Sequence, residues 1–260
     1  MILFLCSIPD PASLNIRDRL LEIGGWVPID NFDDEPVYRW GNALLASMTR
    51  LHLHADDIDV TLRDALGLKP DVIVFLSKHE SASRKRTLTV HPIGNFSDAQ
   101  LGGQPKTLVP AASHHMTAAL RGLKTEVGKT GIPYDVSFEA THHGPYLSTP
   151  SFFAEIGSDA KAWTDPQAGR AVAGALMSAL KVREETIAIG VGGGHYAPRH
   201  TEVALRKNVS FGHIIPRYQP ISAELVDMMI GATPGVEWVH FHGTDEKERE
   251  LFESRGLLSC

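Results

Sequence analysis

Three short segments of the 260-residue chain place histidine beside charged residues or glycine, each where a strand is expected to end. The first covers residues 77–81 and reads Ser-Lys-His-Glu-Ser. In it, Lys78 could hold an anion, His79 could bind a metal or carry a proton, and Glu80 could act as a base. The alternative for this segment is a solvated turn at the end of a strand.

The second segment, residues 139–145, reads Glu-Ala-Thr-His-His-Gly-Pro. Polar and apolar residues alternate before it, which is typical of a half-buried strand, and Gly-Pro then indicates a turn. His142 and His143 beside Glu139 are hard to explain by packing and favour a catalytic or metal site. Adjacent histidines on a turn can point in different directions, so one could bind a metal while the other contacts substrate.

The third segment follows another apolar run and combines three glycines with His195. Successive glycines let the backbone approach a ligand and can direct N–H groups at a phosphate or at an oxyanion. His195 would then be a metal ligand or an acid–base group, and Arg199 would bind a phosphate or carboxylate. We expect this segment to contact substrate through Gly192, Gly193, Gly194, Tyr196 and Arg199.

Apolar, β-branched runs alternate with helical patterns along the chain. The pattern predicts strands over 2–8, 71–77, 87–91, 134–140, 186–191, 210–215 and 236–240. It predicts helices over 13–23, 61–66, 114–129, 165–182, 199–207, 222–230 and 246–254. This alternation indicates an α/β fold, a mixed, mainly parallel sheet with helices on both faces, whose strand ends collect the polar segments. We expect one domain over 1–260, with insertions near 24–53 and 91–110; the second insertion could be a lid.

Composition narrows the classes of function. The net charge of −6 and the pI near 6.1 argue against indiscriminate nucleic-acid binding, although a local basic face is compatible with them. Cys6 and Cys260 are the two cysteines, so a thiolate zinc site is not expected, and any metal must be held by histidine and carboxylate. No signal peptide or membrane-spanning stretch is evident, which predicts a cytoplasmic protein without a membrane partner.

The three segments, the third continued to Pro198, resemble motifs of the archaeal and plant D-aminoacyl-tRNA deacylases, which occur there in the same order and at similar separations. The context of Phe138 and the first strand are also similar to that family, and the resemblance covers nearly the whole chain. It implies zinc-dependent hydrolysis of the ester that joins a D-amino acid to the 3′ end of tRNA. It also implies a core similar to the peptidyl-tRNA hydrolase and purine nucleoside phosphorylase group.

Under this reading His142, His143 and His195 supply most of the metal ligands, with His79 a further candidate. Glu139 or Glu80 accepts a proton from the attacking water, and Lys78 helps to hold the tRNA end. No obligate protein partner is evident. Three rival functions use the same residues: a zinc-dependent amidohydrolase or deacetylase on a small amide, a phosphorylase-like enzyme, and a non-catalytic module that binds RNA ends.

Overall fold

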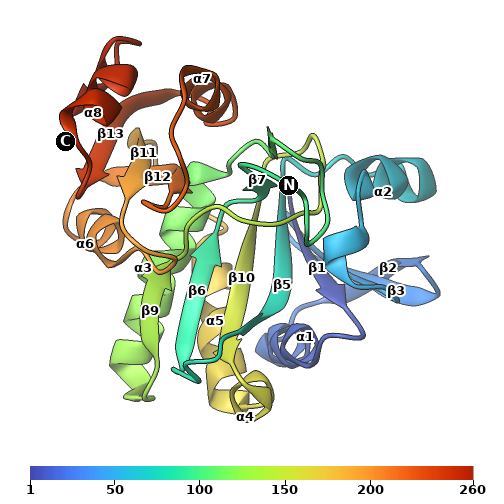
Figure 1. Ribbon diagram of the computed structural model, residues 1–260. Helices are drawn as coiled ribbons and strands as arrows, with labels where there is room; N and C mark the ends of the chain where they lie inside the picture. Colours follow the sequence, from blue (N-terminus) through green and yellow to red (C-terminus); the bar gives the residue numbers. More distant parts are fainter. Residues whose placement is uncertain (260) are drawn as a thin grey trace.

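The computed structural model describes residues 1–259, so Cys260 lies outside the described residues. Two sheets make up the chain, a large mixed one and a smaller parallel one, and they stand beside each other in Figure 1. The three histidine-containing segments described above lie where the two sheets meet.

The large sheet has eight strands in the order β2-β3-β4-β1-β5-β10-β6-β9. Strands β4, β1, β5 and β10 run parallel, β6 is antiparallel to β10, and β9 is parallel to β6 at the edge. The bounds are β1 Ile2–Ser7, β2 Val27–Phe32, β3 Glu35–Trp40, β4 Ala43–Met48, β5 Val72–Glu80, β6 Thr87–His91, β9 Asp135–Phe138 and β10 Ser151–Ser158.

The small sheet is parallel throughout, in the order β12-β11-β13-β14. A two-stranded β7–β8 ladder lies in the connection after β6. The bounds are β7 Gly94–Asn95, β8 Thr107–Leu108, β11 Thr186–Gly192, β12 Val209–Ile215, β13 Val236–His242 and β14 Leu258–Ser259.

Helices cover both faces of the large sheet. The helices α1, α3 and α5 bury their apolar sides against one face, whereas α2 contributes to the apolar cluster on the other. The bounds are α1 Pro11–Ile23, α2 Ile58–Leu66, α3 Ser113–Thr130, α4 Ala160–Trp163, α5 Pro166–Ser178, α6 Pro198–Arg206, α7 Ala223–Gly231 and α8 Glu246–Glu253, with a 3-10 turn over His52–His54. Among the described residues, none of these helices is long and apolar enough to span a membrane.

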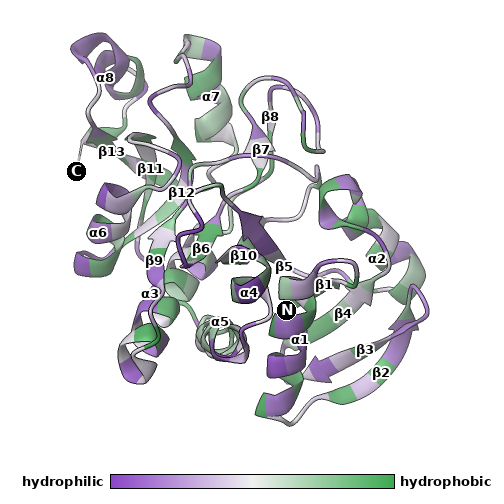
Figure 2. Cartoon of the chain, turned by 60° about the horizontal axis from the view of Figure 1, so that its bottom comes forward, coloured by the Kyte–Doolittle hydropathy of each residue, from purple (hydrophilic) through white to green (hydrophobic). Residues whose placement is uncertain are grey.

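Register decides which strand residues share a face. In neighbouring strands Phe75 pairs with Phe153, and Phe153 with His91, so the three side chains form one row. Two residues further along β10, Glu155 pairs with Ser77 and Thr89 and stands on the same face because side chains alternate. This face is apolar at one end and polar at the other, and the hydrophilic end of β5 is visible in Figure 2.

The predicted α/β class with a mixed, mainly parallel sheet is confirmed, but the strands form two sheets instead of one. Residues 24–53 form the antiparallel strands β2 and β3 and return through β4 to pair with β1. Strand β10 was not predicted, although it lies between β5 and β6 at the centre of the large sheet. Its run Ser-Phe-Phe-Ala-Glu-Ile-Gly-Ser is interrupted by a carboxylate and by glycine, which weakened the strand pattern.

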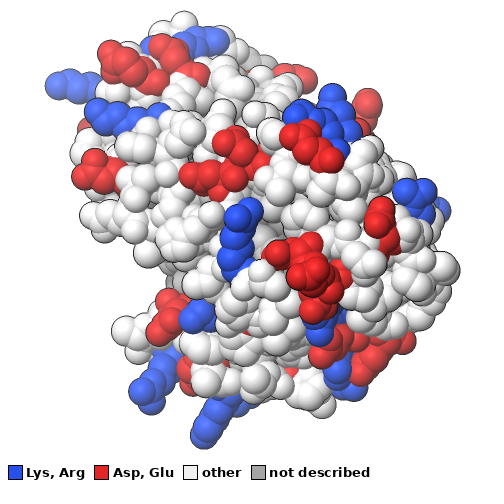
Figure 3. Space-filling view, turned by 90° about the vertical axis from the view of Figure 1, so that its right-hand side faces the viewer, with Lys and Arg blue, Asp and Glu red and all other residues white. Residues whose placement is uncertain are grey.

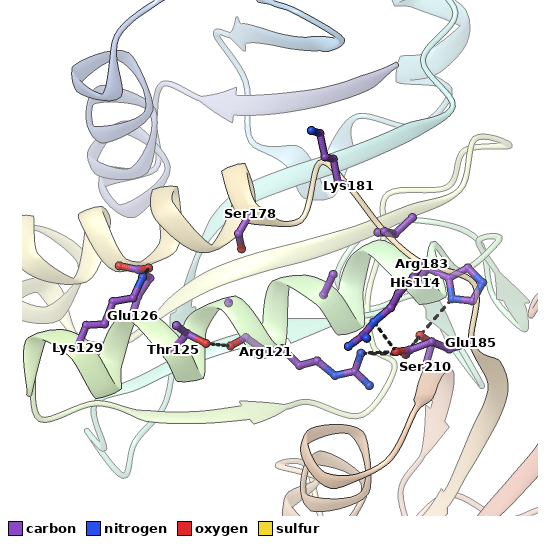
Figure 4. Close-up of a pocket in the computed structure, with 13 residues that line it drawn as sticks. His114, Arg121, Thr125, Glu126, Lys129, Ser178, Lys181, Arg183, Glu185 and Ser210 are labelled. Carbon is purple, nitrogen blue, oxygen red and sulfur yellow. Dashed lines mark hydrogen bonds and ion pairs between the residues drawn. The ribbon is translucent and has the colours of Figure 1, made fainter.

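A buried ion pair joins the two sheets. The Arg121 guanidinium on α3 donates to both carboxylate oxygens of Glu185, at 2.8 and 2.9 Å, and to the carbonyls of Ala204 and Lys207. Glu185, just before β11, also accepts from Ser210 on β12. Figure 4 shows this network at one end of a cavity of about 310 Å³ between α3 and α5. Since its buried charges already have partners, we read it as a structural joint.

Glu185→Ala should therefore destabilise the chain by about 2–3 kcal/mol, because Arg121, whose side chain is only partly exposed, would lose its anionic acceptor. The measurement is the free energy of unfolding in urea. As a matched control, Glu126→Ala removes a carboxylate from the same cavity that pairs with the exposed Lys129, and it should change stability by less than about 1 kcal/mol. An equal loss of unfolding free energy in the two variants would contradict the structural role of the Arg121–Glu185 pair.

Several buried histidines are held neutral by the fold. Burial lowers the pKa of His52 and His213 to about 4 and that of His200 to about 3. His213 contacts the Thr141 hydroxyl at 3.0 Å and the Val109 carbonyl at 2.9 Å. Between pH 6.5 and about 4 the unfolded chain therefore binds protons that the folded chain does not bind, so the folded state loses stability as the pH falls through this window.

We expect the melting temperature to fall steadily between pH 7 and pH 5. His213→Gln removes one of the titrating groups while it retains a side-chain hydrogen bond donor. The slope of unfolding free energy against pH should then decrease by about 1.4 kcal/mol per pH unit in this window. An unchanged slope would mean that His213 is already protonated in the folded chain.

Candidate functional site

A buried carboxylate stands at the centre of the site. Glu155 lies in mid-strand on β10 with only 2% of its surface exposed. Its Oε2 is 3.6 Å from Nδ1 of His79 on β5 and 3.7 Å from Nε2 of His91 at the end of β6. Burial by itself would raise the pKa of Glu155, but the two imidazoles hold it well below its ordinary value. Burial by itself would lower the pKa of both histidines, but Glu155, together with the charge of Glu139, raises it.

A second buried carboxylate, Glu139, follows β9 and faces the same space. Its Oε2 lies 3.1 Å from Nε2 of His195 and 3.7 Å from Nε2 of His142, and its Oε1 lies 3.3 Å from Nδ1 of His79. The loop after β11 brings His195 here because residues 139 and 196 form an antiparallel bridge and the Ala140 N–H donates to the His195 carbonyl. The small sheet thus closes the site that the large sheet begins.

Three histidines present their Nε2 atoms to the centre of the site. The Nδ1 atoms of His91, His142 and His143 lie 3.0, 2.8 and 2.7 Å from the backbone carbonyls of Pro92, Ala140 and Gly144. Since a carbonyl can only accept, Nδ1 carries the proton and Nε2 keeps a free lone pair in the neutral ring. Burial and the neighbouring imidazoles lower the pKa of His143 to about 4 and that of His142 well below its ordinary value, which keeps these two rings neutral.

Metal ligation fits these side chains. Two separate triads have ligand atoms within 4.8 Å of one another, His91-His142-His143 and His79-Glu139-His195, and a third group joins His91, Glu139 and Glu155. Both oxygens of Glu139 and Nε2 of His91 are buried and form no hydrogen bond with any residue that the structure describes. Buried polar atoms of this kind need a partner, and nitrogen with carboxylate oxygen is the donor set that zinc accepts. Hydrogen bonds from Nδ1 to carbonyls are also typical of metal-bound histidine.

A cavity of about 460 Å³ opens beside the cluster. His79, His142, His143, His195 and Glu155 line its inner end, whereas the apolar side chains of Leu51, Leu53 and Leu101 line it from loops. Leu101 comes from the connection 91–110, which rests on the turn after His143 through a hydrogen bond from the Gly144 N–H to the Leu101 carbonyl. The backbones approach so closely that a Cβ on Gly144 would lie 2.1 Å from the Gly103 nitrogen. Glycine is therefore required where the loop packs.

The model of the D-aminoacyl-tRNA deacylase family matches residues 66–256. The chain belongs to this family. The Methanococcoides burtonii D-aminoacyl-tRNA deacylase is 41% identical over 270 residues, which cover 98% of this chain and 55% of that protein. The Methanosarcina mazei D-aminoacyl-tRNA deacylase is 38% identical over 274 residues, covering 98% and 90%. The chain therefore spans about half the length of the first relative and most of the second.

A crystal structure of a conserved protein of unknown function, AF0625, is similar to the fold of this deacylase-family chain. The TM-score is 0.91 at 30% identity, over 100% of this chain and 94% of that one. The two-sheet architecture described above is thus shared over its full extent with an experimentally determined structure.

Five of the residues predicted from sequence come together in this deacylase-family chain: His79, Glu139, His142, His143 and His195. Of the remaining predicted residues, Lys78, Glu80 and Arg199 lie further out. Glu80 is 72% exposed and pairs with Lys78, whose ammonium group lies over the Trp163 ring, although both line the cavity. Arg199 is exposed on α6 and pairs with Glu202, so it does not reach the cluster.

The three glycines predicted to contact substrate differ in their exposure. Gly192 and Gly193 are buried and packed against His242, whereas Gly194 is exposed just before His195. Tyr196 places its hydroxyl oxygen 3.0 Å from Nε2 of His79.

Sequence reasoning missed His91 and Glu155. His91 was counted as the last residue of a strand, and Glu155 belongs to the strand that was not predicted. A usable signal was present, since one carboxylate within an apolar run is rarely buried without a functional partner. The expectation that the chemistry gathers beyond the strand ends also needs correction. His79 and Glu155 stand on the face of the sheet, within β5 and β10.

Glu155→Gln should weaken zinc binding by about 10- to 100-fold, because the charge that positions His79 and His91 would be lost. The measurement is titration of the chelator-treated protein with Zn²⁺, with circular dichroism to verify the fold. Glu80→Gln, at the exposed rim, is the control and should bind zinc like the parent chain. Equal weakening by both variants would place the metal nearer the rim.

Proposed function

We propose that this chain hydrolyses the ester of D-aminoacyl-tRNA with zinc as its cofactor, releasing a free D-amino acid and tRNA. The observation that carries the proposal is the pair of His and Glu triads around two buried carboxylates, in a chain whose family is named for this reaction. The cavity beside the triads offers a place for the aminoacyl group.

Zinc, when bound, would polarise the ester carbonyl and lower the pKa of a bound water towards about 7. The residues that would hold it are His91, His142 and His143 on one side, and His79, His195 and Glu139 on the other. Two triads without a common member are compatible with more than one ion.

Glu139 is the better placed of the two carboxylates that we considered as proton acceptors from water. Its oxygens are buried among the imidazoles of the cluster and form no well-aligned hydrogen bond with the described residues, whereas Glu80 is exposed and pairs with Lys78. In hydrolysis the water oxygen bonds to the carbonyl carbon, the bond to the ribose oxygen breaks, and that oxygen takes a proton. The Tyr196 hydroxyl, which contacts His79, is our candidate for the group that delivers this proton.

The aminoacyl group would occupy the cavity beside the triads. Leu51 and Leu101, 40% and 56% exposed, form an apolar wall of this cavity. The wall would contact the side chain of the bound amino acid without hydrogen bonds that distinguish one polar group from another. Such a wall fits an enzyme with little preference among amino acids. Discrimination between D and L would then depend on where the α-amine and the side chain lie relative to the fixed histidines.

The direct test is release of D-tyrosine and L-tyrosine from matched charged tRNAs, before chelation, after chelation and after addition of Zn²⁺. We expect release of the D-amino acid only, its loss on chelation, and its recovery with zinc. His142→Ala should reduce kcat by at least about 100-fold with the fold intact, since a metal ligand is lost.

Equal release of both enantiomers, or no release with any metal, would exclude this proposal. Activity on a small N-acyl amide in the same preparations would then favour the amidohydrolase alternative.

A further inference from the structure

A second cavity, of about 540 Å³, lies on the other side of Tyr196. It runs between the free edge of β9 and helix α6, and we call it the β9–α6 groove. Val136, Pro198 and Leu205 give it an apolar floor. Figure 1 places β9 and α6 on the side of the molecule opposite α2.

Basic side chains outnumber acidic ones in the groove. Lys85, Lys124 and Arg206 line it, against the acidic Asp135 and Glu202. Lys85 pairs with Asp135 and Arg206 with Glu202, but these pairs are largely exposed, so a cation can turn to an incoming phosphate at little cost. Among the described residues Lys124 has no acidic partner within ion-pair distance. The groove therefore offers one free cation and two that can be shared.

The groove and the catalytic cavity share a wall. Tyr196 lines the groove, and its hydroxyl contacts Nε2 of His79, which lines the other cavity. Thr87 also lines the groove. Its side chain and that of His79 both lie close to Gly157, since a Cβ added to Gly157 would lie 2.6 Å from Thr87 Oγ1 and 3.0 Å from His79. The two cavities thus lie on opposite sides of one histidine of the cluster.

We propose that the β9–α6 groove binds the 3′-terminal nucleotides of the tRNA, while the cavity at the triads holds the aminoacyl group. This inference rests on the proposed function, because it assigns the two sides of the ester to the two cavities. The ester must lie at the cluster, and the two parts that it joins differ in chemistry.

The lining of each cavity decides the assignment. A nucleotide brings phosphates and a flat base, which suit cations above an apolar floor. An amino-acid side chain suits the leucine wall of the other cavity. The face shown in Figure 3, on the side of α2 and β2, carries basic and acidic groups side by side and serves as a reference surface.

The test compares Lys124→Glu/Arg206→Glu with Arg63→Glu, a charge reversal on the exposed surface of α2. D-Tyrosyl-tRNA and D-tyrosine methyl ester, which lacks the nucleotide, are the substrates, and uncharged tRNA is used for direct binding by fluorescence anisotropy. For the groove variant we expect about a tenfold increase in KM for D-tyrosyl-tRNA and in Kd for tRNA. The slope of log Kd against log salt should decrease by about one for each cation lost.

Hydrolysis of the methyl ester should not change in the groove variant, and Arg63→Glu should behave like the parent chain in each assay. An affinity for tRNA within twofold of the parent would overturn the inference, and so would an equal loss of activity on the methyl ester. Binding of uncharged tRNA needs no turnover. Weaker binding by the groove variant would therefore support the groove as the binding site of the tRNA end, even if D-aminoacyl esters proved not to be substrates.

Discussion

Two carboxylates buried against imidazoles, Glu139 and Glu155, are the constraint on which the rest of the site depends. A buried charge is costly unless partners surround it, and here the partners come from β5, β6, the turn after β9 and the loop after β11. Each of these segments must therefore keep its position, because the loss of any one would take away a partner of a buried carboxylate. A bound cation would supply the partner that the Glu139 oxygens lack among the described residues.

The two-sheet architecture follows from this arrangement. One face of the large sheet packs against three helices through an extensive apolar cluster, whereas the other is apolar only as far as the row of Phe75 and Phe153. Beyond that row the face is polar, and the small sheet, held by the Arg121–Glu185 joint, carries His195 over it. Side chains of the candidate site thus come from both sheets and meet on a surface that neither could form alone.

The same arrangement gives the substrate two unlike surroundings. His79 stands between a leucine-lined cavity and a groove with basic residues, and Tyr196 contacts it from the groove side. An ester held at the cluster would have its acyl part on one side and its ribose on the other. If the proposed assignment holds, the separation of the two surroundings by a single side-chain pair would let the chain bind a substrate far larger than the cavity at the histidines.

The sequence by itself determined the alternation of strands and helices, the three polar segments and the family, because these depend on local patterns and on motifs in a fixed order. It thereby identified His79, Glu139, His142, His143 and His195. Only the tertiary structure decided that His91 and Glu155 join them, that Glu80 and Arg199 stay outside, and that the strands divide into two sheets. The physical reason is that strand order and register are non-local: β10 enters the sheet between β5 and β6, and this pairing alone brings residues 79, 91 and 155 onto one face.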